Sequence, residues 1–375
     1  MDFNFTEEQV LLRDAVGRFV REEYTFEARR QILASNDGMS REMWSTMAEL
    51  GLMGMPFSED DGGFGGGPVD TMVVMEELGR GLVVEPYLSS VILAGGALRA
   101  AAPSEMRNTL ISNLVAGESI LAFAHEERGG RGVPSHVALS AEKTESGYVL
   151  NGEKAVVLWG GLANQIVVSA RTAGDVADIE GITLFMVDAG AIGLTRRAYE
   201  TVDGGQAAEL KFDGVQVDAS AILGKAGDGF AIITQVLDEA IAAVCAESLG
   251  VMKALHEQTL EYAQTRKQFG QPIGKFQVTQ HKLVDMYAAY EEAVSMTYMA
   301  TLKLNTNVVE RRRSASAAKA MIGKSVTFVG ETAIQIHGGM GMTDELAASH
   351  YFKRLTMIEA MFGNRDYHLR QLAHG

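Results

Sequence analysis

The hydrophobic period of this 375-residue chain changes twice, and those changes limit the folds open to it. Before about residue 118, and again from Phe230 onward, apolar residues recur at the three-to-four-residue spacing of amphipathic helices. From about residue 120 to residue 225 the chain has short apolar runs separated by turn residues, which is typical of strands. This order predicts an α+β protein with a β domain between two helical domains along the chain.

We place the domain boundaries where the period changes. Residues 1–118 are expected to form an N-terminal helical domain, residues 119–226 a β-barrel or β-sandwich, and residues 227–375 a four-helix bundle. Helices of the first domain are expected at 40–49, 68–79, 91–101 and 105–114. Helices of the last domain are expected at about 230–264, 276–305, 312–337, 344–356 and 365–373.

Local sequence signals predict how some of these elements begin and turn. Thr6 and Gln9 have the spacing of a capping box at the start of the first helix. The pairs Asn151–Gly152 and Asp213–Gly214 stand between apolar runs and predict hairpin turns. The triplet Arg311–Arg313 predicts a solvated helix start.

Charge and cysteine content argue against several classes of function. Lys and Arg number 33 against 48 Asp and Glu, and a chain of net charge −15 is not expected to bind nucleic acid. Cys245 is the only cysteine, which precludes an intrachain disulfide and indicates a reducing, cytoplasmic location. Because we find no zinc-ligand spacing, no apolar run of about 18 residues and no signal peptide, we expect neither a metal site nor a membrane span.

Two segments of the helical C-terminal region carry chemical signals. Thr265–Gln277 (TRKQFGQPIGKFQ) ends one long helix and opens another, and its Arg266 can pair with phosphate while Phe269 can pack on an aromatic ring. Gln335–Met342 (QIHGGMGM) places three glycines after a helix, which permits close backbone approach to a ligand. Each segment also has a plain structural interpretation, as a helix–turn–helix connection and as a helix C-cap.

Two segments of the β region complete the pattern, Ala122–Gly132 (AFAHEERGGRG) and Asn151–Asn164 (NGEKAVVLWGGLAN). The order and spacing of the four segments resemble the acyl-CoA dehydrogenase family, from about residue 3 to residue 373. The resemblance is strongest to the branch that includes the small subunit of bacterial pimeloyl-CoA dehydrogenase, through GGFGGGPVDTMVVMEELGR and HYFKRLTMIEAMFG. It implies the family's fold, with its helical, β and four-helix-bundle domains.

The resemblance also implies an oxidoreductase of fatty acid metabolism that binds FAD and dehydrogenates the Cα–Cβ bond of an acyl-CoA. In the family a glutamate removes the α-proton, the β-hydride passes to flavin N5, and the electrons leave to an electron-transfer flavoprotein. It implies a homo-oligomer, such as a tetramer, or an α2β2 heterotetramer with a homologous subunit. The implied FAD ligands are Arg266, Gln268, Phe269, Gln277, Gln335, Gly338 and Gly339 at the adenosine and pyrophosphate end, and Phe123 and His125 beside the isoalloxazine ring.

The chain departs from the family pattern at several positions of the implied site. The family's W-I-T-N segment aligns with Val156–Trp159, so Leu158 stands where a threonine bonds flavin N5. Gly363 stands where many members carry the catalytic glutamate, and Ala240 stands where a second subset carries it. Neither glycine nor alanine can abstract a proton.

Glu247 is the residue we expect to act as the base. It follows Ala240 by seven residues, which returns a helix to within about 20° of the same face and advances it by about 10.5 Å. Its neighbours on that face are small and apolar, so we expect a buried carboxylate beside room for a ligand. The alternative is that Glu247 pairs with a basic residue across the bundle. Weaker candidates for the base are Glu239, Glu359 and Asp366.

The substrate class and two other functions stay open. The resemblance implies a dicarboxylyl-CoA or medium-chain acyl-CoA, and a pocket lined with small residues would also admit a steroid side-chain thioester. One alternative function is a non-catalytic subunit that completes the FAD site of a companion chain, which Leu158 and Gly363 favour. The other is a flavin monooxygenase of the same fold, which needs neither a base nor CoA.

Overall fold

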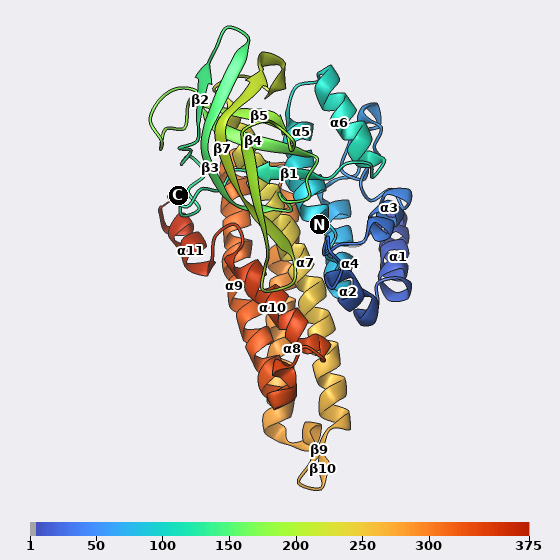
Figure 1. Ribbon diagram of the computed structural model, residues 1–375. Helices are drawn as coiled ribbons and strands as arrows, with labels where there is room; N and C mark the ends of the chain where they lie inside the picture. Colours follow the sequence, from blue (N-terminus) through green and yellow to red (C-terminus); the bar gives the residue numbers. More distant parts are fainter. Residues whose placement is uncertain (1–4, 375) are drawn as a thin grey trace. The chain divides into compact units, whose positions relative to one another are not determined.

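The computed structural model describes residues 5–374, which fold into two compact units (Figure 1). The helical unit contains the chain up to Ile32, the segment Pro68–Val83 and the chain from Ile241 onward. The sheet unit contains Leu33–Gly67 and Val84–Ala240. The expected α+β class is confirmed, and the N-terminal helical region contributes segments to both units.

The helical unit is built around a bundle of long helices. Its α9 packs against α8, α10 and α11, and its α1 packs against α4. The five helices expected after residue 227 are confirmed, whereas α2 was not expected. The helices are α1 (Glu7–Glu22), α2 (Phe26–Leu33), α4 (Pro68–Gly81), α7 (Gly229–Thr265, which begins in the sheet unit), α8 (Gln277–Lys303), α9 (Val308–His337), α10 (Ala347–Ala360) and α11 (Arg365–His374).

The start of α1 confirms the capping box predicted from the sequence. Thr6 Oγ1 accepts a hydrogen bond from the Gln9 N–H at 3.2 Å, and Gln9 Oε1 accepts one from the Thr6 N–H at 3.1 Å. Two N–H groups that a helix start leaves without partners are thereby satisfied.

Two glycines let α4 and α7 approach until their backbones touch. A Cβ on Gly250 would lie 1.8 Å from the carbonyl oxygen of Glu76, and a Cβ on Gly79 would lie 2.2 Å from that of Glu247. Because no side chain fits at either position, the contact fixes where along α4 the middle of α7 lies.

The apolar character of α7 follows from its place in the fold. The helix is long and apolar enough to cross a membrane, with a mean hydropathy of 1.6 over its best window, but 67% of that window is buried inside the folded chain. A central bundle helix that packs on several sides meets the same criterion, so the composition of α7 is weak evidence for a membrane span.

The prediction for the arginine triplet is wrong at Arg311. Asn307 caps α9 by accepting a hydrogen bond from the Glu310 N–H at 3.0 Å, so the helix begins at Val308, before the expected residue 312. Arg311 then falls on the packed face of α9 and is only 9% exposed, whereas Arg313 faces solvent.

The sheet unit contains one sheet and several helices that precede it in the chain. The strands follow the order β6-β7-β3-β2-β4-β5-β8, and β1 pairs in parallel with β4. The strands are β1 (Leu121–Ala124), β2 (Ser140–Lys143), β3 (Gly147–Leu158), β4 (Gln165–Arg171), β5 (Ile182–Asp188), β6 (Leu194–Glu200), β7 (Gln206–Asp218) and β8 (Ile222–Leu223). The helices are α3 (Arg41–Glu49), α5 (Gly95–Ala100), α6 (Glu105–Val115) and the π-helix η2 (Leu88–Ala94).

The hairpin turns predicted at Asn151–Gly152 and Asp213–Gly214 are wrong. Both pairs lie inside long strands, β3 and β7, that run antiparallel through them. The pairing register shifts between Leu150 and Gly152, and Asn151 Oδ1 accepts a hydrogen bond from the Gly214 N–H at 2.8 Å. Both glycines have positive φ, so the residue types that suit a tight turn here form a β-bulge.

Candidate functional site

The end of α7 and the end of α9 lie side by side in the helical unit. The ring of Tyr262 stacks on the ring of His337 with centroids 4.5 Å apart, and its hydroxyl donates to the His337 carbonyl oxygen at 3.4 Å. Arg266 follows Tyr262 by one helical turn, and Gln335 precedes His337 by two residues. The structure therefore brings the two glycine-containing segments singled out in the sequence to one end of the bundle.

The first segment forms a small hairpin, β9 (Lys267–Gln268) and β10 (Gln271–Pro272), that projects where α7 passes into α8 (Figure 1). Phe269 occupies its turn with a φ of +53° and is 91% exposed. Arg266, Gln268 and Gln277 are exposed as well, and Gln277 is the first residue of α8. Within residues 5–374 the Arg266 guanidinium has no ion-pair partner, so it is open to an anion.

The second segment presents backbone rather than side chains. Gln335 is exposed near the end of α9, and Gly338 and Gly339 follow in the 3₁₀ turn Gly338–Met342. Nothing in the described chain lies within 4 Å of where a Cβ of either glycine would stand, and Gly338 has a φ of +62°. This surface is open to a ligand that approaches the main chain closely.

The two residues expected beside the flavin ring, Phe123 and His125, lie on and just after β1 in the sheet unit. They are 7% and 5% exposed, and their ring centroids are 6.0 Å apart. Burial, together with the positive charge of Lys154, lowers the pKa of His125 to about 3, so its imidazole is neutral at physiological pH.

A fully buried lysine, Lys154, is hydrogen-bonded to the same serine that contacts the His125 ring. Lys154 Nζ donates to the Glu127 carboxylate at 2.7 Å, to Ser169 Oγ at 2.9 Å and to the His125 carbonyl oxygen at 3.2 Å. The Ser169 hydroxyl accepts from Lys154 and lies 3.0 Å from His125 Nδ1, to which it can donate its own proton. This arrangement favours Nδ1 as the acceptor, which places the ring proton of the neutral imidazole on Nε2.

Two further residues of the sheet unit bear on the implied flavin site. Glu126 is half-buried, and burial raises the pKa of its carboxyl against the opposing effect of Lys154. Leu158 ends β3, and its carbonyl oxygen accepts a hydrogen bond from Ser89 Oγ at 2.8 Å. Its side chain has no hydroxyl to offer a ligand.

Glu247 lies in the middle of α7 and is paired across the bundle. It is 6% exposed, and the expected apolar neighbours on its face are buried. Its Oε1 accepts from Arg354 Nε at 2.5 Å and its Oε2 from the terminal guanidinium nitrogen at 2.7 Å. The predicted burial is confirmed, and the basic partner named as the alternative is present on α10.

The weaker candidates for the base are engaged differently. Glu239 pairs with Arg99 and accepts a hydrogen bond from Gln235 Nε2 at 3.0 Å. The Glu359 carboxylate accepts from the Arg365 N–H at 3.0 Å, at the start of α11. Asp366 is exposed on the same helix.

Lys319 fixes the loop that carries Gly363. This lysine of α9 is fully buried, and its Nζ donates to the carbonyl oxygens of Glu359 and Gly363, each at 2.8 Å. Burial lowers its pKa to about 8. Gly363 has a φ of +96°, and a Cβ there would lie 2.4 Å from the ring of Tyr367, so the loop has no room for a side chain that could act as a base.

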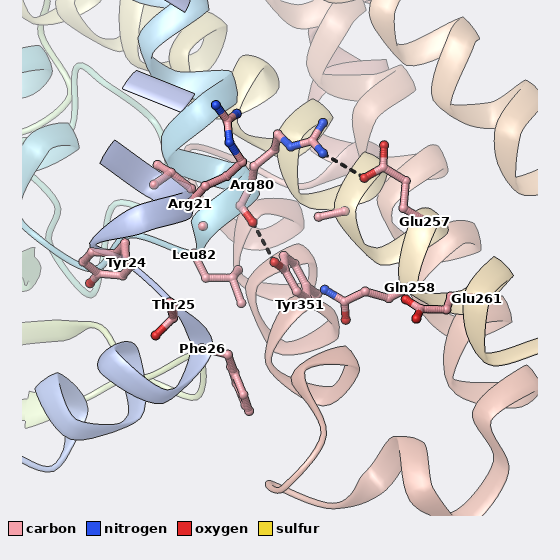
Figure 2. A pocket seen from close by; sticks show the side chains of 13 residues that line it. Arg21, Tyr24, Thr25, Phe26, Arg80, Leu82, Glu257, Gln258, Glu261 and Tyr351 are labelled. Carbon is pink, nitrogen blue, oxygen red and sulfur yellow. Dashed lines mark hydrogen bonds and ion pairs between the residues drawn. The ribbon is translucent and has the colours of Figure 1, made fainter. Parts of the chain in front are cut away.

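A cavity of about 380 Å³ opens in the helical unit between α1, α2, α4, α7 and α10 (Figure 2). Arg80 donates to Glu257 at 2.8 Å, and the Tyr351 hydroxyl donates to the Arg80 carbonyl oxygen at 2.6 Å across its wall. Ala254 of α7 lines it and lies on the same helix face as Glu247, roughly 10 Å further along. None of the predicted cofactor ligands lines this cavity.

Comparison with known proteins identifies the family. Three family models match in order: acyl-CoA dehydrogenase N-terminal domain (residues 6–118), middle domain (122–215) and C-terminal domain (227–375). An acyl-CoA dehydrogenase of Bacillus subtilis (strain 168) is 31% identical over 366 residues, which are 96% of each chain. The chain belongs to the acyl-CoA dehydrogenase family.

Two solved structures of this family's fold are similar over the whole chain. The ChsE4–ChsE5 complex from Mycobacterium tuberculosis contains a chain 28% identical with a TM-score of 0.90, and the match covers 100% of this chain and 98% of that one. The FAD complex of PigA is 25% identical with a TM-score of 0.91 and the same coverage. The fold implied by the sequence resemblance is confirmed.

Acyl-CoA dehydrogenases use FAD, and the exposed groups at the bundle end suit part of it. The unpaired Arg266 guanidinium matches a phosphate, and the open backbone at Gly338 and Gly339 admits one closely. The exposed ring of Phe269 matches a purine face. In the sheet unit, the neutral ring of His125 has one N–H to donate, while Leu158 cannot donate through its side chain.

Sequence reasoning missed two buried lysines, Lys154 and Lys319, and the partly buried Arg354, because lysine and arginine are normally on the surface. A signal for two of them was present. The strand period that buries Tyr148 and Leu150 reaches Lys154, and the apolar helix face of Ala315 and Ile322 includes Lys319.

Within residues 5–374 no group of three or more His, Cys, Asp or Glu side chains could hold a metal ion.

Proposed function

We propose that this protein is an FAD-dependent dehydrogenase of an acyl-CoA thioester and that Glu247 is its base. The observation that carries the proposal is the buried Glu247 carboxylate on α7. The two positions where family members carry the base hold Gly363 and Ala240 in this chain, and neither residue is an acid. When bound, FAD accepts the hydride that leaves the β-carbon. The chain's own part is to remove the α-proton, which passes from the α-carbon to a Glu247 oxygen.

The finer details of the proposal follow the family resemblance. The substrate is a dicarboxylyl-CoA or medium-chain acyl-CoA, or a thioester with a steroid side chain, and the electron acceptor is an electron-transfer flavoprotein. Arg266, Gln268, Phe269, Gln277, Gln335, Gly338 and Gly339 hold the adenosine and pyrophosphate end of FAD, and Phe123 and His125 lie beside the flavin ring. We place the enzyme in the reducing cytoplasm, because Cys245 is buried and free.

Anaerobic bleaching of the flavin by a panel of acyl-CoA thioesters tests the proposal. Glu247→Gln should keep flavin and lose bleaching by about 10²- to 10⁴-fold, because the amide cannot take a proton. Glu257→Gln is the matched control, since Glu257 is also on α7 and paired with an arginine, yet is half exposed. Bleaching of Glu247→Gln at the wild-type rate would rule Glu247 out as the base.

A second candidate function is a subunit that completes the FAD site of a homologous companion. Leu158, which lacks a side-chain donor, and the similarity to a chain of the two-protein ChsE4–ChsE5 complex support it. The visible spectrum of the chain expressed alone separates the two. About one FAD per chain favours the complete enzyme, whereas a colourless chain that gains flavin only with a companion favours the subunit.

A further inference from the structure

Glu247 and Arg354 form a bidentate ion pair. The guanidinium uses Nε for one carboxylate oxygen and a terminal nitrogen for the other, at 2.5 and 2.7 Å. The side chain of Glu247 is 8% exposed and that of Arg354 is 20% exposed. Two parallel bonds of this kind fix the plane of the carboxylate as well as its position.

The other charges near Glu247 are directed elsewhere. On α4, Glu76 and Glu77 face Arg13 of α1, at 3.1 and 3.9 Å. On α9, Lys319 is bonded to two carbonyl oxygens and adjoins Cys245.

The contact that α4 makes with Glu247 is uncharged. A Cβ at Gly79 would lie 3.1 Å from the Glu247 side chain, so this glycine presents main chain alone. The described charges thus leave Arg354 as the group that compensates the buried negative charge of Glu247.

We propose that Arg354 is the positioning residue of the base: it keeps the buried Glu247 ionised and holds it in one orientation, so that the carboxylate can accept the α-proton. This inference rests on the proposed function, because it assigns Arg354 a role only if Glu247 is the base. Without a cation, a carboxylate in this apolar surrounding would take up a proton from solvent and could accept no other.

The bidentate ion pair is compatible with proton transfer to Glu247. Each carboxylate oxygen has two lone pairs, and Arg354 occupies one on each oxygen, so a lone pair remains for the incoming proton. In the step, the α C–H bond breaks, the proton goes to a Glu247 oxygen and the electron pair stays on the substrate. Arg354 neither gives nor takes a proton, because a guanidinium is not deprotonated in proteins.

Infrared spectroscopy tests the ionisation directly, without substrate or turnover. Arg354→Gln should gain a protonated-carboxyl band at pH 7 that the wild type lacks, and the band should vanish in the double variant Arg354→Gln/Glu247→Gln. A folded Arg354→Gln variant without such a band at pH 7 would overturn the proposal.

The pH dependence of flavin bleaching tests the same point in the working enzyme. In Arg354→Gln the acid limb of the rate profile should move to higher pH by about one unit or more. In Arg354→Lys it should move by less, because lysine keeps the positive charge but cannot make the two parallel hydrogen bonds. Lys353→Gln is the control, since Lys353 is the neighbouring cation and pairs with exposed Asp344 at 2.7 Å.

The outcomes separate this inference from the proposed function. A rate that falls equally at every pH in both Arg354 variants would show a structural role only and overturn the inference. If Arg354→Gln does not fold, an unmoved acid limb in Arg354→Lys overturns it as well. A wild-type protein that no acyl-CoA bleaches would contradict the proposed function, while the infrared result would still report on the pair.

Discussion

Three ionisable side chains, Lys154, Glu247 and Lys319, are almost completely buried and hydrogen-bonded: Lys154 and Glu247 have a partner of opposite charge, and Lys319 has two carbonyl oxygens. Lys154 has an acceptor for each of its three N–H bonds, so its burial leaves no donor unsatisfied. Removing one partner of a buried ion pair lowers the stability of the protein more than replacing both partners, because a charge is then left buried alone. Variants at these sites therefore need conservative replacements.

We expect His125 to remain neutral, with its proton on Nε2, as pH falls from 8 to about 4. Burial lowers its pKa to about 3, and the Ser169 hydroxyl occupies Nδ1. Nitrogen-15 NMR of the histidine side chains measures both properties. In Ser169→Ala the acceptor nitrogen loses its donor, so the tautomer with the proton on Nδ1 should gain population.

Ser140→Ala is the control for that experiment, since the Ser140 hydroxyl donates to the Asn151 carbonyl oxygen outside the network. A wild-type His125 that carries its proton on Nδ1 would contradict the assignment.

The lowered pKa of His125 also makes the stability of the fold depend on pH. An unfolded histidine takes up a proton below about pH 6.5 and the folded one does not until about pH 3, so His125 makes folding less favourable as pH falls through that window.

At the scale of elements, the contact between α4 and α7 should tolerate no added methyl group. Gly250→Ala would place a Cβ 1.8 Å from the Glu76 carbonyl oxygen, so the helices must separate, at a cost of about 2 kcal/mol or more in the free energy of unfolding. Urea denaturation measures this change in the free energy of unfolding. Gly96→Ala on α5 is the control, because its Cβ would meet nothing closer than 3.4 Å and alanine favours helix. Equal stability of both variants would disprove the close approach.

The elements also show what a sequence can predict. The long helices of the bundle were predicted because their period is maintained over many turns, and the capping box of α1 is a purely local signal. Asn151–Gly152 was misread because a hairpin turn and a β-bulge both use residues that tolerate positive φ, and only pairing with β7 decides between them.

The same limit applies to the candidate site. Burial of Glu247 was predictable, because helical geometry alone places it on the face of Ala240. Its partner Arg354 was not predictable, because the residue of α10 that meets α7 is set by packing between segments about a hundred residues apart. Whether Glu247 is the base stays a prediction that kinetics must test.

At the scale of the whole molecule, one end of the bundle carries polar and aromatic groups that the chain itself does not use. Arg266 has no ion-pair partner among residues 5–374, Phe269 is 91% exposed, and the backbone of Gly338 and Gly339 is open. These groups are available to a ligand or to a second chain. We infer that these groups hold FAD in an assembled oligomer, where the cofactor can also contact a neighbouring subunit.

That inference predicts that Arg266→Gln weakens FAD binding without changing the fold. Loss of one charged hydrogen-bond donor to a phosphate should reduce FAD affinity by about tenfold to a hundredfold, measured by fluorescence titration of the flavin-free protein. Lys267→Gln is the control, because Lys267 is the adjacent exposed cation on β9. Gel filtration followed at a protein and a flavin wavelength should also show flavin eluting with the oligomer. Equal affinity in Arg266→Gln and the wild type, or stoichiometric flavin on a monomer, would mean that the bundle end serves another ligand.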